Sequence, residues 1–260
     1  MSSDSVLVKA EEDFTTITMN RPERRNALSL GLLREMTAAF RAAGDTSARG
    51  LILAANGPVF SAGHDFRDLA GADAGSIREL LDSCTELMVT MQSIPQPVVA
   101  RVHGLATAAG CQLVATADLA VASEDAGFAT PGGKGGWFCH TPLVAVARNV
   151  SPKRALELGL TGDTIDARTA LEWGLVNHVV PTEQLDDATV SLLRRATRGS
   201  LASKALGKQT FYAQIGLDQR AAYEHALDVM TQSSQSSDAQ KGFAAFLEKR
   251  PPRFEERRHS

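Results

Sequence analysis

The sequence predicts an α/β protein whose first part alternates strands with helices and whose last part is helical. Short runs of β-forming residues recur in the first half, and each is followed by a segment with helical spacing. Almost everything from Glu183 onward has helical character. The chain has 260 residues, of which 43% are hydrophobic, so it can bury a large core.

The first elements read as a β-hairpin followed by a helix. The runs SVLVKA and FTTITMN are separated by the acidic EED, which suggests an opening hairpin. Ser29 is available as an N-cap for the helix. The apolar residues at helical spacing are Leu30, Leu33, Met36 and Phe40.

The strand and helix unit then repeats. The expected elements are a buried strand at 50–55, a helix at 76–94, a strand at 97–104, a short helix in AAGCQLVATA and a strand in DLAVAS. Strands that alternate with helices at this spacing favour parallel pairing.

The character of the chain changes after about residue 140. LVAVARNVSPKRALELGL and DARTALEWGL read as helices, and NHVV as one late strand. Ser237 and Gln240 form a possible capping box for a final helix through Lys249. Its apolar residues Phe243, Phe246 and Leu247 need a partner surface, which is either the same domain or a second subunit.

Composition disfavours several classes of partner. The formal net charge is -3 and the pI is about 6.1, so no basic stripe for nucleic acid and no polybasic membrane patch is expected. The three cysteines lack the close spacing of a disulfide scaffold or a zinc site, and we predict no metal site. The start resembles no signal peptide and no run approaches a membrane span, so a cytoplasmic protein is expected.

Small residues follow two neighbouring strands. Ser61 to His64 come after the first, and ATAAG after Gly104 adds the start of a helix, whose free N–H groups favour negative charge. Two backbone donors from these loops would form an oxyanion hole. The alternative is that Ala108, Ala109 and Gly110 only permit tight packing of helix on strand.

Six motifs together resemble the crotonase (enoyl-CoA hydratase/isomerase) superfamily. In order they are RPERRNALS, FSAGHDF, HGLATAAGCQLVATADLAVAS, FATP, LTGDTIDARTALEWGLVNHVV and KGFAAFLEKR. The segments ATAAGCQL and FATPG are most similar to those of the subgroup called enoyl-CoA hydratase domain-containing protein 3. The resemblance implies a spiral of ββα repeats over residues 1–198, and a helical region at 199–260 that forms a homotrimer or a hexamer.

The resemblance also implies which residues hold the substrate, a coenzyme A thioester such as an acyl-CoA or enoyl-CoA, with no tightly bound cofactor. It places the two oxyanion-hole N–H groups on His64 and Ala109. The residues implied to hold coenzyme A are Arg24, Arg25, Ala27 and Ala62, together with Phe246 and Lys249 from a neighbouring subunit. Without the resemblance, Arg24, Arg25 and Lys249 would be interpreted as solvated surface charges.

The two glutamates that act in hydratases of the family are absent. Gln112 stands at the first position and Gly132 at the second, and neither can exchange a proton near neutral pH. Some relatives place a catalytic aspartate eight residues beyond the second position, where this chain has His140. Its imidazole could serve as acid or base, or it could be a structural histidine.

Three classes of function therefore remain open. The first is an enoyl-CoA hydratase or isomerase with altered acid–base groups. The second is another crotonase reaction that uses His140, such as isomerisation, thioester hydrolysis or decarboxylation. The third is a pseudoenzyme that binds acyl-CoA without turnover.

Overall fold

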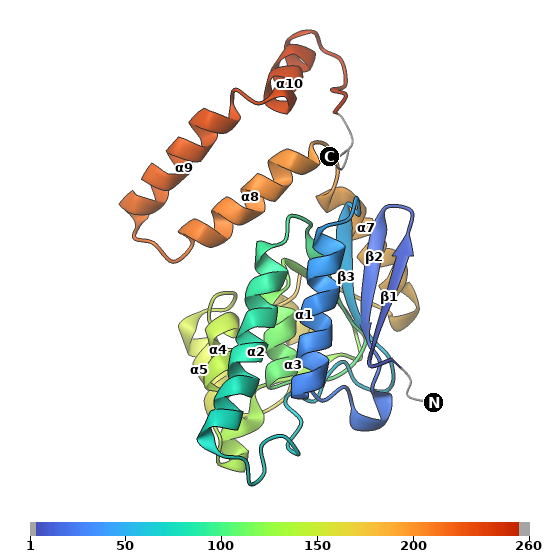
Figure 1. The fold of residues 1–260 in the computed structure, drawn as a ribbon, viewed down its shortest axis with the longest axis vertical. Coiled ribbons are helices and arrows are strands. Elements are labelled where there is room, and N and C mark those ends of the chain that lie inside the picture. Colours follow the sequence, from blue (N-terminus) through green and yellow to red (C-terminus); the bar gives the residue numbers. More distant parts are fainter. Residues whose placement is uncertain (1–3, 255–260) are drawn as a thin grey trace.

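A computed structural model describes residues 4–254 and confirms the α/β class (Figure 1). Six strands form the main sheet in the order β1-β2-β3-β4-β6-β9. The predicted hairpin is present, with β1 antiparallel to β2, and the remaining neighbours are parallel. The strands are β1 (Val6–Glu11), β2 (Phe14–Met19), β3 (Gly50–Ala55), β4 (Val98–Val102), β6 (Leu119–Ser123) and β9 (His178–Val180).

A second, smaller sheet shows why the fold is a spiral of ββα units. It contains β5 (Ala106–Thr107), β7 (Gly127–Ala129) and β8 (Ile165–Asp166). Single-residue bridges extend it, because Ser61 pairs with Ala106 and Leu28 pairs with His64. Four parallel strands of the main sheet, β2, β3, β4 and β6, are thus each followed by a short segment in the second sheet and then by a helix.

The first two helices begin at residues that the local sequence explains. The Ser29 side chain caps α1 (Leu30–Gly44) by accepting a hydrogen bond from the Leu32 N–H, as predicted. Asp73 caps α2 (Ala74–Ser93), which starts two residues before the expected position. All eight residues of α3 (Ala109–Thr116) are buried.

Helices cover both faces of the main sheet. One apolar cluster joins the sheet to α1, α2 and α3, and a second joins Ile52, Val99 and Val121 to α7 (Leu185–Ala196) on the opposite face. Burial on both faces explains the uninterrupted apolar run of β3. The other helical elements of this part are η1 (Pro22–Arg24), η2 (Pro131–Gly135), α4 (His140–Val146), α5 (Pro152–Thr161), α6 (Ala167–Trp173) and η3 (Thr182–Gln184).

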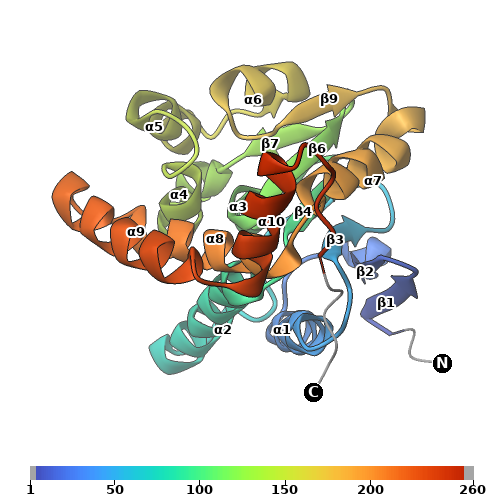
Figure 2. The same cartoon turned by 90° about the horizontal axis from the view of Figure 1, so that it is seen from above.

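Three helices at the end of the chain extend away from the sheet (Figures 1 and 2). They are α8 (Leu201–Gln214), α9 (Gln219–Ser233) and α10 (Ser237–Leu247). The boundary expected at residue 198 lies in the loop between α7 and α8. Among the described residues of these helices, only Ala205 and Ala245 are buried.

The expected start and end of the last helix are each wrong by a short distance. Ser236, and not Ser237, caps α10, because the Ser236 hydroxyl accepts the Ala239 N–H and Gln240 donates to the Ser234 carbonyl instead. The helix ends at Leu247, and Lys249 has a left-handed backbone with φ of 53°. Throughout residues 4–254, no helix is long and apolar enough to cross a membrane.

Candidate active site

A cavity of about 350 Å³ lies where the loops after β3 and β4 meet the segment from η2 to the start of α4. Its walls are mainly apolar. The lining residues are Ala62, His64, Phe66, Leu81, Thr107, Ala108, Ala109, Pro131, Gly132, Gly135, Trp137, Phe138, Cys139, His140, Thr141 and Pro142. The predicted oxyanion residues His64 and Ala109 and the predicted base His140 therefore share one cavity.

The two predicted oxyanion loops lie in close contact. Gly63 has φ of 84°, and a Cβ atom built on it would lie 3.2 Å from the Ala109 nitrogen and 3.0 Å from the Thr107 carbonyl oxygen. Glycine at this position therefore allows the backbone of His64 to approach the start of α3. Neither the His64 N–H nor the Ala109 N–H donates a hydrogen bond to any described residue.

Gly110 is required for the same approach. A Cβ atom on Gly110 would lie 2.5 Å from the Ser61 carbonyl oxygen and 2.8 Å from the Ser61 Cβ. The small residues of this stretch therefore do permit tight packing, and the packing is between the two loops.

Ala108 holds the turn before α3 in a strained backbone conformation. Its φ of 52° and ψ of -119° are rarely adopted by a residue with a Cβ atom. Its N–H donates to the Ala129 carbonyl oxygen at 2.9 Å, which ties the turn to β7. The Ala109 N–H is a free donor because it is the first N–H of a buried helix and has no intrahelical acceptor.

The segment predicted to hold coenzyme A packs against the first oxyanion loop. The Ala62 N–H donates to the Arg25 carbonyl oxygen at 3.0 Å, and the Leu28 N–H donates to the Gly63 carbonyl oxygen at 2.7 Å. The Asn26 side chain fastens the segment further by donating to the Asn56 and Val59 carbonyl oxygens. The structure thus brings Arg24, Arg25 and Ala27 next to Ala62 at the edge of the site.

Gln112 does not line the cavity. Gln112 is 5% exposed and packs under α2. There the Cys84 thiol donates to the Gln112 amide oxygen over 4.0 Å. The glutamine therefore occupies a core position of the buried helix α3. It lies one helical turn after Ala109 on α3, but it is not among the residues that line the cavity.

The second glutamate position has no space for a side chain. A Cβ atom on Gly132 would lie 2.2 Å from the Trp137 carbonyl oxygen and 2.8 Å from the Cys139 sulfur. The loop from Gly132 to Cys139 folds back on this glycine, and the Trp137 N–H donates to the Gly132 carbonyl oxygen at 3.0 Å. A carboxylate at position 132 would require the whole loop to move.

His140 lies at the first residue of α4 with an exposed side chain. Its ring packs 5.1 Å from the ring of Phe138. Among the described residues, this ring contact is the one interaction of the His140 side chain. The cavity therefore contains the predicted base at its rim, without an orienting partner.

The His64 side chain is the feature that sequence reasoning missed. The sequence singled out only its backbone N–H, whereas both ring nitrogens lie buried beside the cavity without a hydrogen-bond partner. Burial lowers the pKa of the imidazole, although the Leu28 carbonyl and the Asp68 carboxylate raise it in part. A polar residue directly after SAG, in a motif of small residues, was the available signal.

The buried cysteines have no activated thiol. Burial raises the pKa of Cys84 and of Cys111 to about 12, and it also raises that of Cys139, which lines the cavity. A thiol with a raised pKa is a poor nucleophile near neutral pH. Residues 4–254 also hold no group of three metal-ligating side chains.

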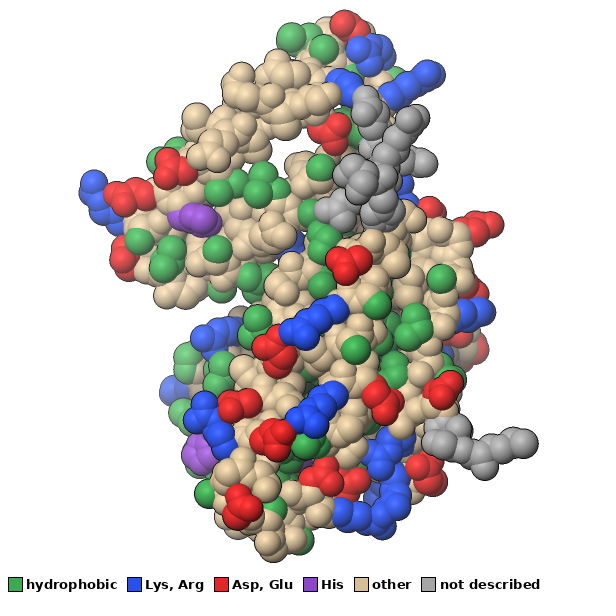
Figure 3. Space-filling view, in the orientation of Figure 1, with side chains coloured by type: hydrophobic (Ala, Val, Ile, Leu, Met, Phe, Trp, Pro, Cys, Tyr) green, Lys and Arg blue, Asp and Glu red, His purple; other side chains and the backbone are tan. Residues whose placement is uncertain are grey.

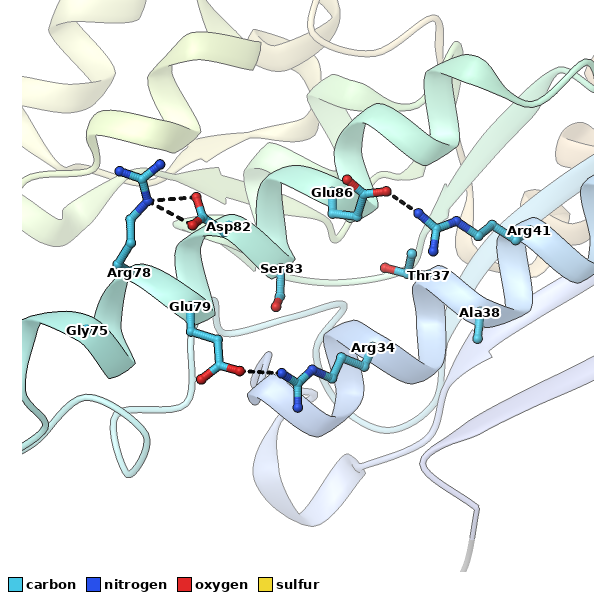
Figure 4. Close-up of a pocket in the computed structure, with 10 residues that line it drawn as sticks. All are labelled: Arg34, Thr37, Ala38, Arg41, Gly75, Arg78, Glu79, Asp82, Ser83 and Glu86. Atoms are coloured by element: carbon cyan, nitrogen blue, oxygen red, sulfur yellow. Dashed lines mark hydrogen bonds and ion pairs between the residues drawn. The ribbon is translucent and has the colours of Figure 1, made fainter.

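A second hollow, between α1 and α2, is a less suitable ligand site (Figure 4). Each of its three arginines is paired with a carboxylate. The pairs are Arg34 with Glu79, Arg41 with Glu86, and Arg78 with Asp82. These exposed ion pairs leave no unpaired charge that would recognise a ligand.

Phe246 and Lys249 lie outside the cavity of their own chain. Phe246 is 83% exposed on α10, and Figure 1 shows this helix at the opposite end of the molecule from α4. Neither residue is among those that line the cavity. Any contribution of these residues to a site has to come from a second copy of the chain.

Comparison with known proteins places the chain among proteins with the same fold. The profile of the Enoyl-CoA hydratase/isomerase family matches residues 9–257. A solved structure of enoyl-CoA hydratase from Mycobacterium smegmatis superposes with a TM-score of 0.93 at 42% identity, covering 96% of this chain and 99% of that one. The human enoyl-CoA hydratase domain-containing protein 3 gives a TM-score of 0.92 at 39% identity, covering 96% and 100%.

A curated relative supports the subgroup resemblance and corrects one expectation. The enoyl-CoA hydratase domain-containing protein 3 of Danio rerio is 43% identical, with 96% of this chain and 88% of that protein aligned. It is named a mitochondrial protein, as is its human counterpart, so the expectation of a cytoplasmic protein is wrong on this comparison. The profile match, the shared fold and these identities show that the chain belongs to the enoyl-CoA hydratase/isomerase family of the crotonase superfamily.

Proposed function

We propose that the chain is an acyl-CoA enzyme that stabilises a thioester enolate between the N–H groups of His64 and Ala109. The observation that carries this proposal is the close approach of the two loops, since a Cβ atom built on Gly63 would lie only 3.2 Å from the Ala109 nitrogen. Both N–H groups are free of protein acceptors. Donors that are already oriented in an apolar cavity stabilise developing negative charge strongly.

The coenzyme A part of the substrate binds along the segment from Arg24 to Ala27 in this proposal. The exposed Arg25 side chain and the partly buried Arg24 suit phosphate groups as charge partners. Ala62 contributes backbone next to this segment. Phe246 and Lys249 of a neighbouring subunit complete the site in a homotrimer or a hexamer, and the exposure of Phe246 supports such a role.

Hydration by the usual pair of glutamates does not fit this cavity. Among its described lining residues there is no carboxylate, and the position of Gly132 is filled by the Trp137 carbonyl. An enolate-based reaction with one imidazole, such as a double-bond shift, needs fewer groups and is the reaction type that we favour. Thioester hydrolysis or decarboxylation with His140 uses the same oxyanion hole.

A non-catalytic acyl-CoA-binding protein is the second candidate. The absence of carboxylates from the described lining of the cavity favours it over a standard hydratase. Under this alternative the oxyanion donors bind the thioester carbonyl without any proton transfer. Both candidate functions therefore predict that the chain binds acyl-CoA, but only the enzyme is expected to turn it over.

Two measurements test the proposed function. Calorimetric titration with butyryl-CoA and with free coenzyme A should show tighter binding of the thioester, because only the thioester offers a carbonyl to the two N–H groups. With crotonyl-CoA, loss of the conjugated thioester absorbance through hydration should be at least about 100-fold slower than in a two-glutamate hydratase, since acid–base groups contribute about 10²–10⁴-fold. If neither ligand binds, the proposed function fails.

A further inference from the structure

We propose that the His64 imidazole is the group that removes and returns the α-proton of the bound thioester. This inference rests on the proposed function, since it requires the thioester carbonyl between the His64 and Ala109 N–H groups. It assigns the side chain of His64 a role separate from that of its backbone. The role replaces the two missing carboxylates.

Two side chains that line the cavity are candidates for the proton transfer. His64 and His140 are the two imidazoles among the described lining residues, and no lining residue carries a carboxylate. Cys139 also lines the cavity, but burial raises its pKa, which keeps the thiol protonated. The choice is therefore between the two histidines.

Position favours His64. The proton to be removed lies on the carbon next to the carbonyl, and the carbonyl oxygen is held by the N–H of His64 itself. The side chain of that same residue belongs to the lining of the cavity that would hold the acyl group. A β-bridge fixes the backbone of His64 to Leu28, and the ring of Trp137 lies 6.4 Å from that of His64, centroid to centroid.

The unpartnered nitrogens of His64 point to a ligand. Buried side-chain nitrogens nearly always have a hydrogen-bond partner, and neither Nδ1 nor Nε2 of His64 has one. A half-turn of the ring about its Cβ–Cγ bond exchanges each nitrogen with a carbon and keeps the ring shape. The residue lines the cavity, and this rotation places nitrogens where the ring carbons now lie.

The surroundings keep the ring in its basic form. Burial lowers the pKa of His64 below its usual 6.5, and Asp68 and the Leu28 carbonyl reduce this effect only in part. The other acidic neighbour along the loop, Asp65, is paired with Arg21 at 3.6 Å. The imidazole is therefore neutral at pH 7 and able to accept a proton. His140 is exposed, and its ring has no such confinement.

The proposed step is balanced without any further reactant. An imidazole nitrogen takes the α-proton, the carbon–hydrogen bond breaks, and its electron pair forms the enolate. The negative charge rests on the oxygen between the His64 and Ala109 N–H groups. The imidazolium then returns a proton to the α-carbon, which gives exchange, or to the γ-carbon of an enoyl thioester, which gives a double-bond shift.

Deuterium exchange tests this step directly. Butyryl-CoA is incubated with the protein in D₂O, and incorporation of deuterium at the α-carbon is followed by mass spectrometry. His64→Gln keeps a polar side chain but cannot exchange a proton, and we expect the rate to fall at least about 100-fold. The exchange rate of the unaltered protein should rise with pH and level off above a pKa below 6.5. Calorimetry with butyryl-CoA should show that the variant still binds within about threefold.

Two further variants make the assignment decisive. His178→Gln changes an exposed histidine of β9 outside the cavity and should leave the exchange rate unaltered. His140→Gln tests the competing assignment and should cause a smaller loss than His64→Gln. The proposal is overturned if the larger loss follows His140→Gln, if His64→Gln exchanges normally, or if the unaltered protein binds butyryl-CoA without exchange. Absence of binding by the unaltered protein refutes the proposed function itself.

Discussion

The buried helix α3 and the exposed helix α9 represent two regions that are stabilised in different ways. All eight residues of α3 are buried, whereas none of the fifteen residues of α9 is. The spiral that contains α3 has its own two-faced core. The region from α8 to α10 presents apolar side chains on its surface, visible beside α8 and α9 in Figure 3. The spiral therefore has a core of its own, whereas the terminal helices leave much of their apolar surface exposed.

The strongest link between the two regions is a buried ion pair. Lys208 of α8 lies 2.7 Å from Asp118, with side chains 8% and 14% exposed, and Tyr212 donates to the same carboxylate at 2.8 Å. Lys208 also donates to the Met91 and Gln96 carbonyl oxygens. Burial raises the pKa of Asp118 and lowers that of Lys208, so each charge depends on the other.

Breaking this link should have the largest effect on stability. Asp118→Asn leaves a buried lysine without its counter-charge, and we expect a loss of about 3–5 kcal/mol in the free energy of unfolding. Urea denaturation followed by circular dichroism measures this loss. The double variant Asp118→Asn with Lys208→Met should lose less than the single variant. A loss below about 1 kcal/mol for Asp118→Asn would show that the link is unimportant.

A substitution in the oxyanion loops should affect the spiral more moderately. Gly110→Ala places a methyl group 2.5 Å from the Ser61 carbonyl oxygen, and overpacking of this kind costs about 1–3 kcal/mol. Because the loops must separate, affinity for butyryl-CoA should fall as well. Thermal unfolding and calorimetry measure the two effects.

Gly31→Ala is the matched control for that substitution. An added Cβ on Gly31 of α1 meets nothing within 4 Å, so stability should stay equal or rise slightly. If Gly110→Ala behaved like Gly31→Ala in both stability and ligand affinity, the close approach of the two loops would not be needed.

The smallest effect on folding is expected on the exposed face of α9. Met230 is 71% exposed, so Met230→Asp should change the unfolding free energy of the spiral by no more than about 0.5 kcal/mol. We expect the same variant to reduce the mass of the assembled protein in size-exclusion chromatography with light scattering. Thr231→Asp adds the same charge to an adjacent, differently oriented position and serves as control. An assembly that Met230→Asp leaves intact would argue against α9 as a subunit interface.

Local sequence signals predicted the main sheet and the first helices well. The hairpin, the strand at 50–55 and the Ser29 cap depend on residues close together in the chain, and all three are confirmed. The second sheet could not be predicted, because β5 and β8 have two residues each and Leu28 and Ser61 contribute single bridges. Segments this short carry no periodicity.

The site was predictable in its backbone and less so in its side chains. Runs of small residues identified the loops of His64 and Ala109. The burial of Gln112 under α2 and the filling of the Gly132 position by the Trp137 carbonyl depend on contacts between distant segments. The same holds for the unpartnered ring of His64, since only the fold shows that neither nitrogen has a partner.

A crystal structure of the protein with butyryl-CoA tests the central claim most directly. We predict the thioester carbonyl oxygen at about 3 Å from both the His64 and the Ala109 backbone nitrogens, with the acyl group against Trp137. A butyryl-CoA whose carbonyl lies elsewhere in the cavity, with both N–H groups still unpaired, would contradict the account.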